Sequence, residues 1–422
     1  MSSYAAFLGH QPHLSIAELS ASIPDFTLRK VLGPKGALTG GSKNIIVFES
    51  NELIDAAYLH MLGGTVALAK RLTDETVTLD DIPTMLATEL QAVKGKLVFS
   101  LRSYGLPPGK VKELYRKCKD RLRKHGRNAR YVGSPGQPAA TALLRDEGIL
   151  DGKHGCELVL IAEDESLWVG RTVAAQDIDA YAKRDMEKPV RDTTVGLLPP
   201  KLAQILLNIG WWLVRESLPS SERTQMTGKK RTPLTVLDPF CGTGVVAMEA
   251  LLRGWTVLAT DMSQKAVNGC IKNLEWLRKE EGILKKDVQA TVWKQDARKP
   301  FELKEKPDVI VTETTLGPPL TRRAPLKEAR QWKRENENLQ IDFLKNASRT
   351  LPGVPVACIW PVWYTSKGMV RLEGVMEEAH KLGYQATLPP GVESDFSDRT
   401  TLLYRRPDQF VGREVVMLRT RR

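Results

Sequence analysis

The stretch that decides the fold runs from Leu234 to Ala247 and reads LTVLDPFCGTGVVA. A β-branched run leads into Asp238, and Gly242 and Gly244 follow directly before an apolar run with helical spacing. Glycine lets the backbone turn tightly and approach a ligand without a Cβ atom in the way. A strand, a glycine turn and a helix in this order form the ligand site of open α/β sheets, at the carboxyl ends of the strands.

Strands and helices alternate on both sides of this stretch, which is typical of a parallel sheet with helices on its faces. Apolar periodicity predicts a lead-in helix over 198–214 and another helix over 263–279. Further strands are predicted over 256–261, 290–296, 307–313 and 355–360. We therefore expect a Rossmann-like α/β domain over 178–422.

Acidic residues end three successive predicted strands. Asp238 is placed to meet a cationic amino acid, Asp261 to bind ribose hydroxyls, and Asp296 to bind an adenine amine. This arrangement suits a nucleoside that carries an amino acid. Two alternatives remain open: the aspartates cap helices, or the glycine spacing belongs to a dinucleotide fingerprint. The expected cofactor contacts on this edge are Asp238, Phe240, Gly242, Gly244, Asp261, Met262, Asp296 and Ala297.

Positive charge is concentrated in one segment. From Lys94 to Arg130 there are 13 Lys and Arg residues against two acidic residues, while the whole chain carries +12. A predicted helix over 108–126 holds much of this charge, which creates a field that attracts polyanions. The alternative is a solvated helix face. We expect the helix to bind nucleic acid through Arg116, Lys119 and Arg123.

Several classes of protein are not indicated by the sequence. The five cysteines form no C-x-x-C pair and the six histidines do not cluster near them, so neither a disulfide framework nor a metal site is expected. No apolar run reaches the roughly 18 residues of a membrane span. The N-terminus MSSYAAFLGH lacks the features of a signal peptide. A cytoplasmic protein is expected.

The DPFCGTG motif and the strand-end acids resemble those of class I methyltransferases, whose cofactor is S-adenosylmethionine. Four separate segments resemble the tRNA guanine-N2 methyltransferases that act at position ten; they span 3–21, 169–179, 181–210 and 402–416. The resemblance implies a ferredoxin-like region over 1–70, a THUMP RNA-binding domain over 71–177 and the methyltransferase domain over 178–422. It also implies that Pro199 and Lys201 border the cofactor, for which the alternative is a plain helix start.

The segment after the fourth strand departs from that family. Amine methyltransferases carry Asp or Asn, then Pro-Pro and an aromatic residue, where this chain reads Glu313-Thr314-Thr315-Leu316-Gly317. The resemblance implies that Glu313 is catalytic and that Thr314, Thr315, Leu316 and Gly317 contact the substrate. The aromatic residue is missing, and Trp363, after the predicted fifth strand, is a candidate for the stacking ring. The alternative for Trp363 is core packing.

Three functions follow from these observations. The first is an S-adenosylmethionine-dependent enzyme that forms N2-methylguanosine in tRNA, expected at position ten. The second is a tRNA-binding protein that keeps the cofactor site without activity. The third is a dinucleotide-dependent oxidoreductase. For the first, the expected partner is tRNA, with no metal and no membrane, and the protein is expected to be a monomer unless it needs an activator subunit.

Overall fold

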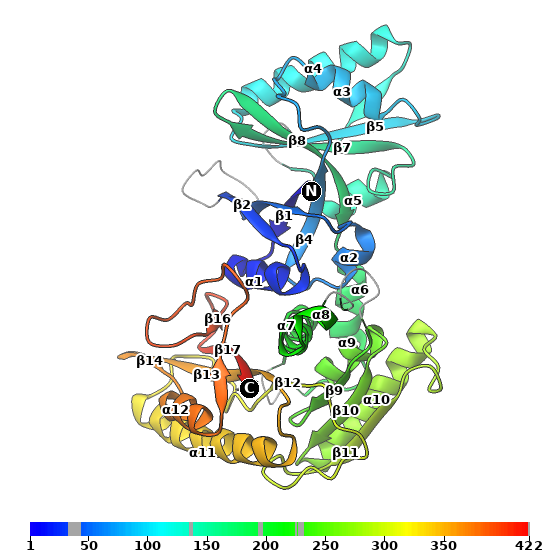
Figure 1. Ribbon diagram of the computed structural model, residues 1–422. Coiled ribbons are helices and arrows are strands. Elements are labelled where there is room, and N and C mark those ends of the chain that lie inside the picture. The colour runs from blue at the N-terminus through cyan, green and yellow to red at the C-terminus, as the bar shows by residue number, and fades with distance from the viewer. Residues whose placement is uncertain (33–43, 135–137, 193–196, 224–225, 227–231, 421–422) are drawn as a thin grey trace. The chain divides into compact units, whose positions relative to one another are not determined.

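The computed structural model describes residues 1–32, 44–134, 138–192, 197–223, 226 and 232–420, and the chain divides into two compact units. The first comprises Met1–Pro12, Asp25–His60 and Thr65–Ile178, and the second His13–Pro24, Met61–Gly64 and Asp179–Arg422. Figure 1 colours the chain by residue number, from blue at the N-terminus to red at the C-terminus. Two short N-terminal segments thus belong to the second unit, a grouping that the sequence does not predict.

The first unit is built on one mixed eight-stranded sheet. Its strands are β1 (Ser2–Leu8), β2 (Thr27–Leu32), β3 (Ile45–Ser50), β4 (Thr65–Arg71), β5 (Leu97–Tyr104), β6 (Ala129–Tyr131), β7 (Gly155–Glu163) and β8 (Ser166–Ala175). They lie in the order β2-β3-β1-β4-β8-β7-β5-β6, and only β5 has parallel neighbours on both sides. The predicted boundary between residues 70 and 71 falls inside β4, which pairs with both β1 and β8. The division into two N-terminal domains stays a prediction.

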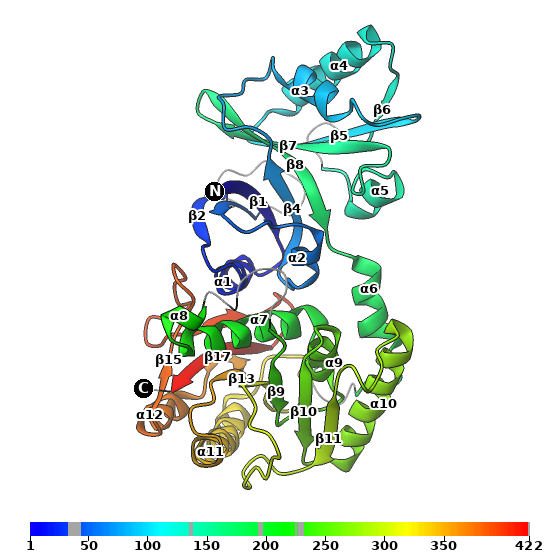
Figure 2. The same ribbon diagram turned by 45° about the vertical axis from the view of Figure 1, so that its right-hand side comes forward.

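Helices cover both faces of the β5–β7–β8 part of this sheet. They are α3 (Ile82–Glu89), α4 (Pro108–Lys124) and α5 (Thr141–Asp146), while α2 (Ala56–His60) contacts β4 and β8. Figure 2 shows α3 and α4 on one face and α5 on the other. The predicted basic helix is confirmed as α4, which buries Val111, Leu114, Cys118 and Leu122. Its charged residues therefore remain on the faces turned away from the sheet.

The second unit is built on a sheet whose first five strands are parallel. Its strands are β9 (Thr235–Asp238), β10 (Thr256–Asp261), β11 (Ala290–Lys294), β12 (Val309–Glu313), β13 (Val356–Thr365), β14 (Gly368–Val370), β15 (Tyr384–Ala386), β16 (Leu402–Tyr404) and β17 (Val411–Thr420). The main order is β11-β10-β9-β12-β13-β17-β15, with β17 antiparallel to both of its neighbours. Numbered by their place in the chain, these strands lie in the order 3-2-1-4-5-7-6. The predicted α/β class is confirmed.

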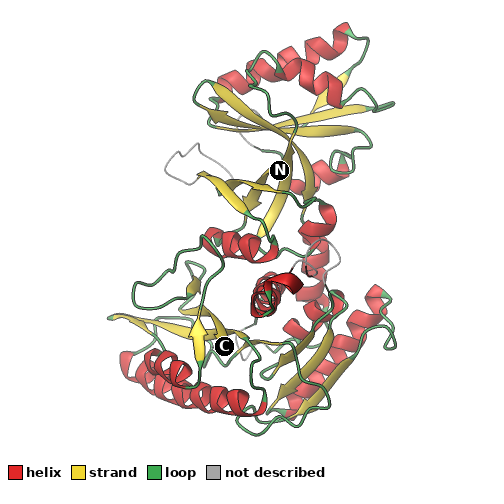
Figure 3. Ribbon diagram, in the orientation of Figure 1, coloured by secondary structure: helices red, strands yellow, loops and turns green. Residues whose placement is uncertain are grey.

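Helices pack on both faces of this sheet, as Figure 3 shows. They are α1 (Pro12–Ser22), α7 (Pro200–Ser217), α9 (Val245–Leu252), α10 (Gln264–Glu281), α11 (Leu326–Thr350) and α12 (Glu373–Lys381). The chain also forms the short helix α6 (Ile178–Ala182) and a π-helical turn, η2, at Lys183–Glu187 before α7, and the short helix α8 (Ser220–Arg223) after it. Helices α1, α7, α9 and α10 share one apolar core, and α11 and α12 share another. Most of α7 is buried, which explains why it is apolar on nearly all sides.

Two predicted elements differ in extent. The apolar residues between 53 and 62, followed by two glycines, predict a helix over 53–64, but α2 covers only Ala56–His60. Beyond α2, the N–H groups of Gly63 and Gly64 donate to the buried carboxylate of Glu18. The fifth strand, predicted to end at residue 360, continues to Thr365 as β13. Pairing with β17 and then with β14 extends it.

Candidate active site

A cavity of about 570 Å³ opens at the carboxyl ends of β9, β10 and β12, where the sequence places the ligand site. Its volume lies within the roughly 300–1,000 Å³ of small-molecule sites. The residues lining it are Asp192, Leu197, Leu198, Asp238, Pro239, Phe240, Cys241, Gly242, Thr243, Val245, Val246, Asp261, Met262, Ser263, Ala266, Asp296, Ala297, Arg298, Glu313, Thr314, Thr315, Leu316, Gly317 and Leu339. Most of the residues predicted to bind the cofactor therefore line a single cavity.

The two glycines of the turn have different structural roles. Gly242 has a φ of +52° and its N–H donates to the Asp261 carboxylate at 3.0 Å. Gly244 has a φ of +90°, and a Cβ atom there would lie 2.5 Å from Sγ of Cys270 on α10. Gly244 does not line the cavity and packs α9 against α10, and its predicted contact with the cofactor stays a prediction.

Asp238 is a buried carboxylate at the end of β9. Its side chain accepts hydrogen bonds from Oγ1 of Thr312 at 2.6 Å and from the N–H of Phe240 at 3.3 Å. Burial raises the pKa of Asp238 to about 7, against the opposing effect of these two donors. The negative charges of Asp261 and Glu313 contribute to the same upward shift. A bound cation would favour the charged form of this group.

Asp261, at the end of β10, is held rigidly by the backbone. Its Oδ1 accepts from the N–H of Ser263 at 2.8 Å, and its Oδ2 accepts from Gly242. The carboxylate therefore faces the cavity in one orientation. The next residue, Met262, is 64% exposed and lines the same cavity with its apolar side chain.

Asp296 lies beyond β11 and is already paired in this structure. The Arg298 guanidinium binds both carboxylate oxygens, at 2.8 Å to Oδ2 and 2.9 Å to Oδ1. Hydrogen bonding to Arg298 keeps the pKa of Asp296 below its usual range. The buried Ala297 follows it. Both residues line the cavity, and the predicted contact of Asp296 with an adenine amine stays a prediction.

Glu313 ends β12 and lines the cavity from the other side. Its Oε1 accepts a hydrogen bond from Nε of Arg413 on β17 at 2.7 Å. Burial raises the pKa of Glu313, and the Arg413 charge and hydrogen bond oppose that shift. Sequence reasoning missed Arg413, although an Arg-Glu pair inside the apolar run of β17 is an unusual signal.

The segment after Glu313 is fixed to β13. Thr314 is buried and donates to the carbonyl of Ile359 at 2.7 Å, while Thr315 is exposed. The Leu316 carbonyl accepts from the Trp363 indole N–H at 3.0 Å, and Gly317 packs against the same ring. Trp363 is fully buried, so the prediction that it stacks on a base is wrong; it supports this segment from the core.

The predicted cofactor contacts at the start of α7 are not found in the cavity wall. Pro199 precedes the first helical residue, Pro200, and does not line the cavity. Lys201 turns away as the helix begins, and its Nζ lies 4.8 Å from the centre of the Tyr181 ring. Leu197 and Leu198, just before the helix, line the cavity where Pro199 and Lys201 were expected.

The basic residues singled out on α4 belong to the first unit. Arg116 and Arg123 are exposed, and Arg123 lies 3.4 Å from Asp120. Lys119 is partly buried, with its Nζ 5.9 Å from the Tyr115 ring centre. These side chains remain available to phosphate groups. In the parts of the chain that the structure describes, no group of three or more His, Cys, Asp or Glu residues is arranged to hold a metal ion.

The strand order 3-2-1-4-5-7-6, with one antiparallel strand, defines the second unit as a Rossmann-like fold of the class I methyltransferase type. The glycine turn and the acids at the ends of β9 and β10 lie at its ligand-binding edge. No helix among the described residues has the length and apolar character needed to cross a membrane.

Comparisons with known proteins agree with this class. The family model described as "Conserved hypothetical protein 95" matches residues 221–340. The chain is 29% identical over 164 residues to the tRNA (guanine(10)-N2)-dimethyltransferase of Methanothermobacter thermautotrophicus. That match covers 39% of this chain, and the chain spans 38% of the length of that relative. The predicted resemblance to tRNA guanine-N2 methyltransferases is thus confirmed over this stretch.

Solved structures also resemble the chain. TrmN from Thermus thermophilus is 17% identical, and the comparison covers 100% of both chains with a TM-score of 0.48. The magnesium protoporphyrin IX methyltransferase (ChlM) from Synechocystis PCC 6803 with bound SAH is 14% identical, with a TM-score of 0.31. That comparison covers 56% of this chain and 94% of the other.

Proposed function

We propose that the protein is an S-adenosylmethionine-dependent methyltransferase that modifies the N2 amine of a guanine in tRNA. The observation that carries the proposal is the meeting of Asp238, Asp261 and Glu313 in one cavity, each from the carboxyl end of a different parallel strand. The relative from Methanothermobacter supports guanine ten as the nucleotide. A tRNA substrate would place the protein in the cytoplasm.

The cavity fits the cofactor at two points. Asp238 is a buried carboxylate with a pKa of about 7, and an ammonium group bound beside it would favour its charged form. Asp261 presents a fixed carboxylate that can accept hydrogen bonds from two neighbouring ribose hydroxyls. When bound, S-adenosylmethionine supplies an electrophilic methyl group on a sulfonium.

Glu313 would hold the guanine amine. Its carboxylate can accept a hydrogen bond from the amine N–H, which aligns the nitrogen toward the cavity without a strong base. Fixing reactants in this way and excluding water lowers the barrier chiefly through orientation. The same carboxylate can accept the proton that the nitrogen loses after transfer.

A tRNA-binding protein without activity is the second candidate. The observation that favours it is the missing aromatic residue: the segment 314–317 contributes none to the cavity, and Trp363 is buried. Incubating the full chain with labelled S-adenosylmethionine and unmodified tRNA separates the two functions. Label in N2-methylguanosine supports the enzyme, whereas tRNA binding without transfer supports the second candidate.

The affinity for S-adenosylhomocysteine should depend on pH through Asp238. The ammonium group of S-adenosylhomocysteine binds the charged form of the Asp238 carboxylate. The affinity should therefore rise from roughly pH 6 to roughly pH 8 and then level off. Below the pKa the change approaches about tenfold per pH unit. Calorimetry in two buffers of different ionisation enthalpy should show proton release near pH 6. Asp238→Asn should bind weakly at every pH; a parent affinity that is flat across this range would contradict the assignment.

Helix α4 should contribute to tRNA affinity. Reversing Arg116, Lys119 and Arg123 to Glu should weaken binding and lower the salt dependence, by a log-log slope of about 0.7–0.9 for each phosphate that is no longer neutralised. The matched control reverses three exposed lysines of the second unit, Lys272, Lys285 and Lys286, which changes the net charge equally. Filter binding at several salt concentrations measures both slopes. Equal slopes for the two variants would show that the α4 residues are only solvated.

A further inference from the structure

The strand β17 carries two adjacent buried charges in an otherwise apolar stretch. Arg413 is 4% exposed and Glu414 is 0% exposed. Successive side chains of a strand point to opposite faces of the sheet, so these two charges lie on opposite faces. A buried charge is costly unless it is paired, and each of the two has its own partner.

On one face, Arg413 joins two walls of the cavity. Its Nε donates to Oε1 of Glu313 at 2.7 Å, and its Nη2 donates to the carbonyl of Leu197 at 3.0 Å. Glu313 and Leu197 line the cavity, but Arg413 does not. The guanidinium therefore holds both groups from behind, outside the space that a substrate would enter.

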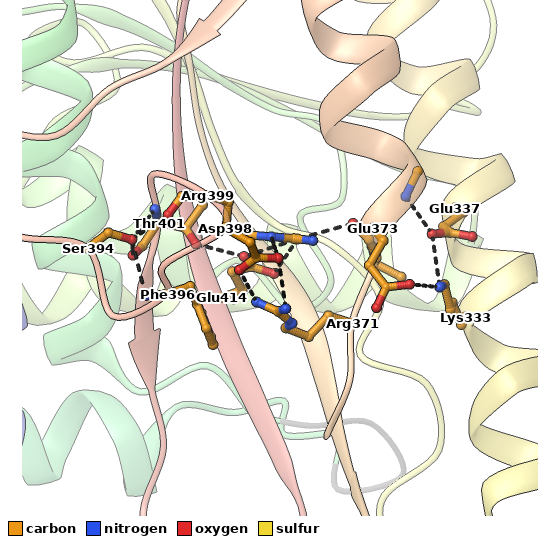
Figure 4. Close-up of polar contacts among 12 residues, drawn as sticks. Lys333, Glu337, Arg371, Glu373, Ser394, Phe396, Asp398, Arg399, Thr401 and Glu414 are labelled. Atoms are coloured by element: carbon orange, nitrogen blue, oxygen red, sulfur yellow. Dashed lines mark hydrogen bonds and ion pairs between the residues drawn. The ribbon is translucent and has the colours of Figure 1, made fainter. Parts of the chain in front are cut away.

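On the other face, Glu414 holds the loop between β15 and β16. Nη1 of Arg399 lies 3.3 Å and 3.4 Å from the two carboxylate oxygens, and Thr401 donates to Oε1 at 2.7 Å. Figure 4 shows this cluster with Arg371 and Asp398 beside it. None of these residues lines the cavity, so the Arg399–Glu414 pair is a buried ion pair of the same kind without contact to the site.

We propose that Arg413 is a positioning residue for the transfer reaction: it fixes the Glu313 carboxylate at the cavity wall and keeps it in the charged form that accepts a hydrogen bond from the target amine. The proposal rests on the proposed function. Its geometric basis is that Arg413 uses only Oε1 of Glu313. Among the described residues, Oε2 has no hydrogen-bond donor, which leaves it for the amine.

The charges around Glu313 make this role necessary. The other titratable groups that line the cavity are Asp192, Asp238, Cys241, Asp261, Asp296 and Arg298. Arg298 is the only cation among the described lining residues, and Asp296 binds it. Burial raises the pKa of Glu313, and Arg413 is the group that opposes the shift. Without Arg413, the carboxyl would stay protonated to a higher pH and would lose acceptor strength.

The test compares Arg413→Met and Arg413→Lys with the matched control Arg399→Met. In Arg413→Met, kcat should fall by about tenfold or more near neutral pH, and the acid limb of its pH profile should move to higher pH. Activity should recover in part as the pH rises. Arg413→Lys keeps the charge and should show a smaller shift. KM and the affinity for S-adenosylhomocysteine should change little, and Arg399→Met should keep the parent profile.

A role confined to structure would give a different result. Arg413→Met and Arg399→Met would then lose activity by a similar factor at every pH, without a shifted limb, and the proposal would be overturned. If Arg413→Met does not fold, Arg413→Lys provides the test, because the acid limb of its kcat profile is also expected to move to higher pH.

Infrared titration measures the protonation of the Glu313 carboxyl directly, without cofactor or substrate. The C=O stretch of a protonated carboxyl that disappears in Glu313→Gln reports Glu313 and separates it from Asp238. In Arg413→Lys or Arg413→Met this band should persist to higher pH than in the parent; an unchanged titration would overturn the proposal. If the parent transfers no methyl group, the proposed function fails, and the infrared result still decides whether Arg413 sets the charge of Glu313.

Discussion

Asp261→Ala is expected to lower the affinity for S-adenosylhomocysteine by two orders of magnitude or more. The carboxylate is fixed by the N–H groups of Gly242 and Ser263 and can accept from two ribose hydroxyls. Each hydrogen bond to a charged group contributes roughly 1.5–3 kcal/mol, so losing two of them outweighs most other single changes. Isothermal titration of both proteins measures the difference.

Asp308 provides the control for Asp261. It flanks the opposite end of β12, where its Oδ2 accepts from the N–H of Thr235 at 2.7 Å, away from the cavity. Asp308→Ala should keep the parent affinity. Asp261→Asn, which retains one acceptor oxygen, should fall between the parent and Asp261→Ala. Equal affinity of Asp261→Ala and the parent would remove Asp261 from the site.

Glu313→Ala is expected to lower kcat by a factor of about 10² to 10⁴ while the affinities for cofactor and tRNA stay close to those of the parent. The reason is positional: Glu313 lies at the end of β12 on the cavity wall and is the only acidic residue between Asp308 and Glu328. An interaction that acts mainly on the aligned amine affects the transition state more than the ground state. Single-turnover measurement with labelled cofactor tests this.

The alanine variant also leaves the Arg413 guanidinium buried without its carboxylate, which costs roughly 3–5 kcal/mol in comparable pairs. Thermal unfolding must therefore accompany the kinetics. Glu313→Gln keeps an acceptor oxygen for Arg413 and is the sharper variant. If it retains most activity, Glu313 positions the amine and the proton leaves to water. If it is as inactive as Glu313→Ala, the charge or proton acceptance is required. Full activity of Glu313→Ala would refute the assignment.

The three strand-end acids could be predicted because a parallel sheet brings the carboxyl ends of its strands to one edge. Asp238, Asp261 and Asp296 each follow a strand that periodicity reveals, so their meeting in one cavity follows from topology. The basic face of α4 could also be predicted from the sequence, because the 3.6-residue period of an α-helix determines which side chains lie on the same face.

The other half of the site depends on contacts between distant residues. Arg413 reaches Glu313 from 100 positions away and Leu197 from 216. No periodic pattern encodes such pairs. The position of Trp363 could not be predicted because the length of β13 is set by its pairing with β17 and β14. The direction of Lys201 could not be predicted either, because it depends on the exact start of α7.

Methyl transfer to a guanine amine is measured most directly with the full chain. The protein is incubated with labelled S-adenosylmethionine and tRNA from a strain that lacks the modification, and the nucleosides are identified by mass spectrometry. Label should appear in N2-methylguanosine, and Asp261→Ala and Glu313→Ala should lower its rate of appearance by the factors given above. Binding of S-adenosylhomocysteine and tRNA without label in any guanosine, or label in another nucleoside, would show that the protein is not a guanine-N2 methyltransferase.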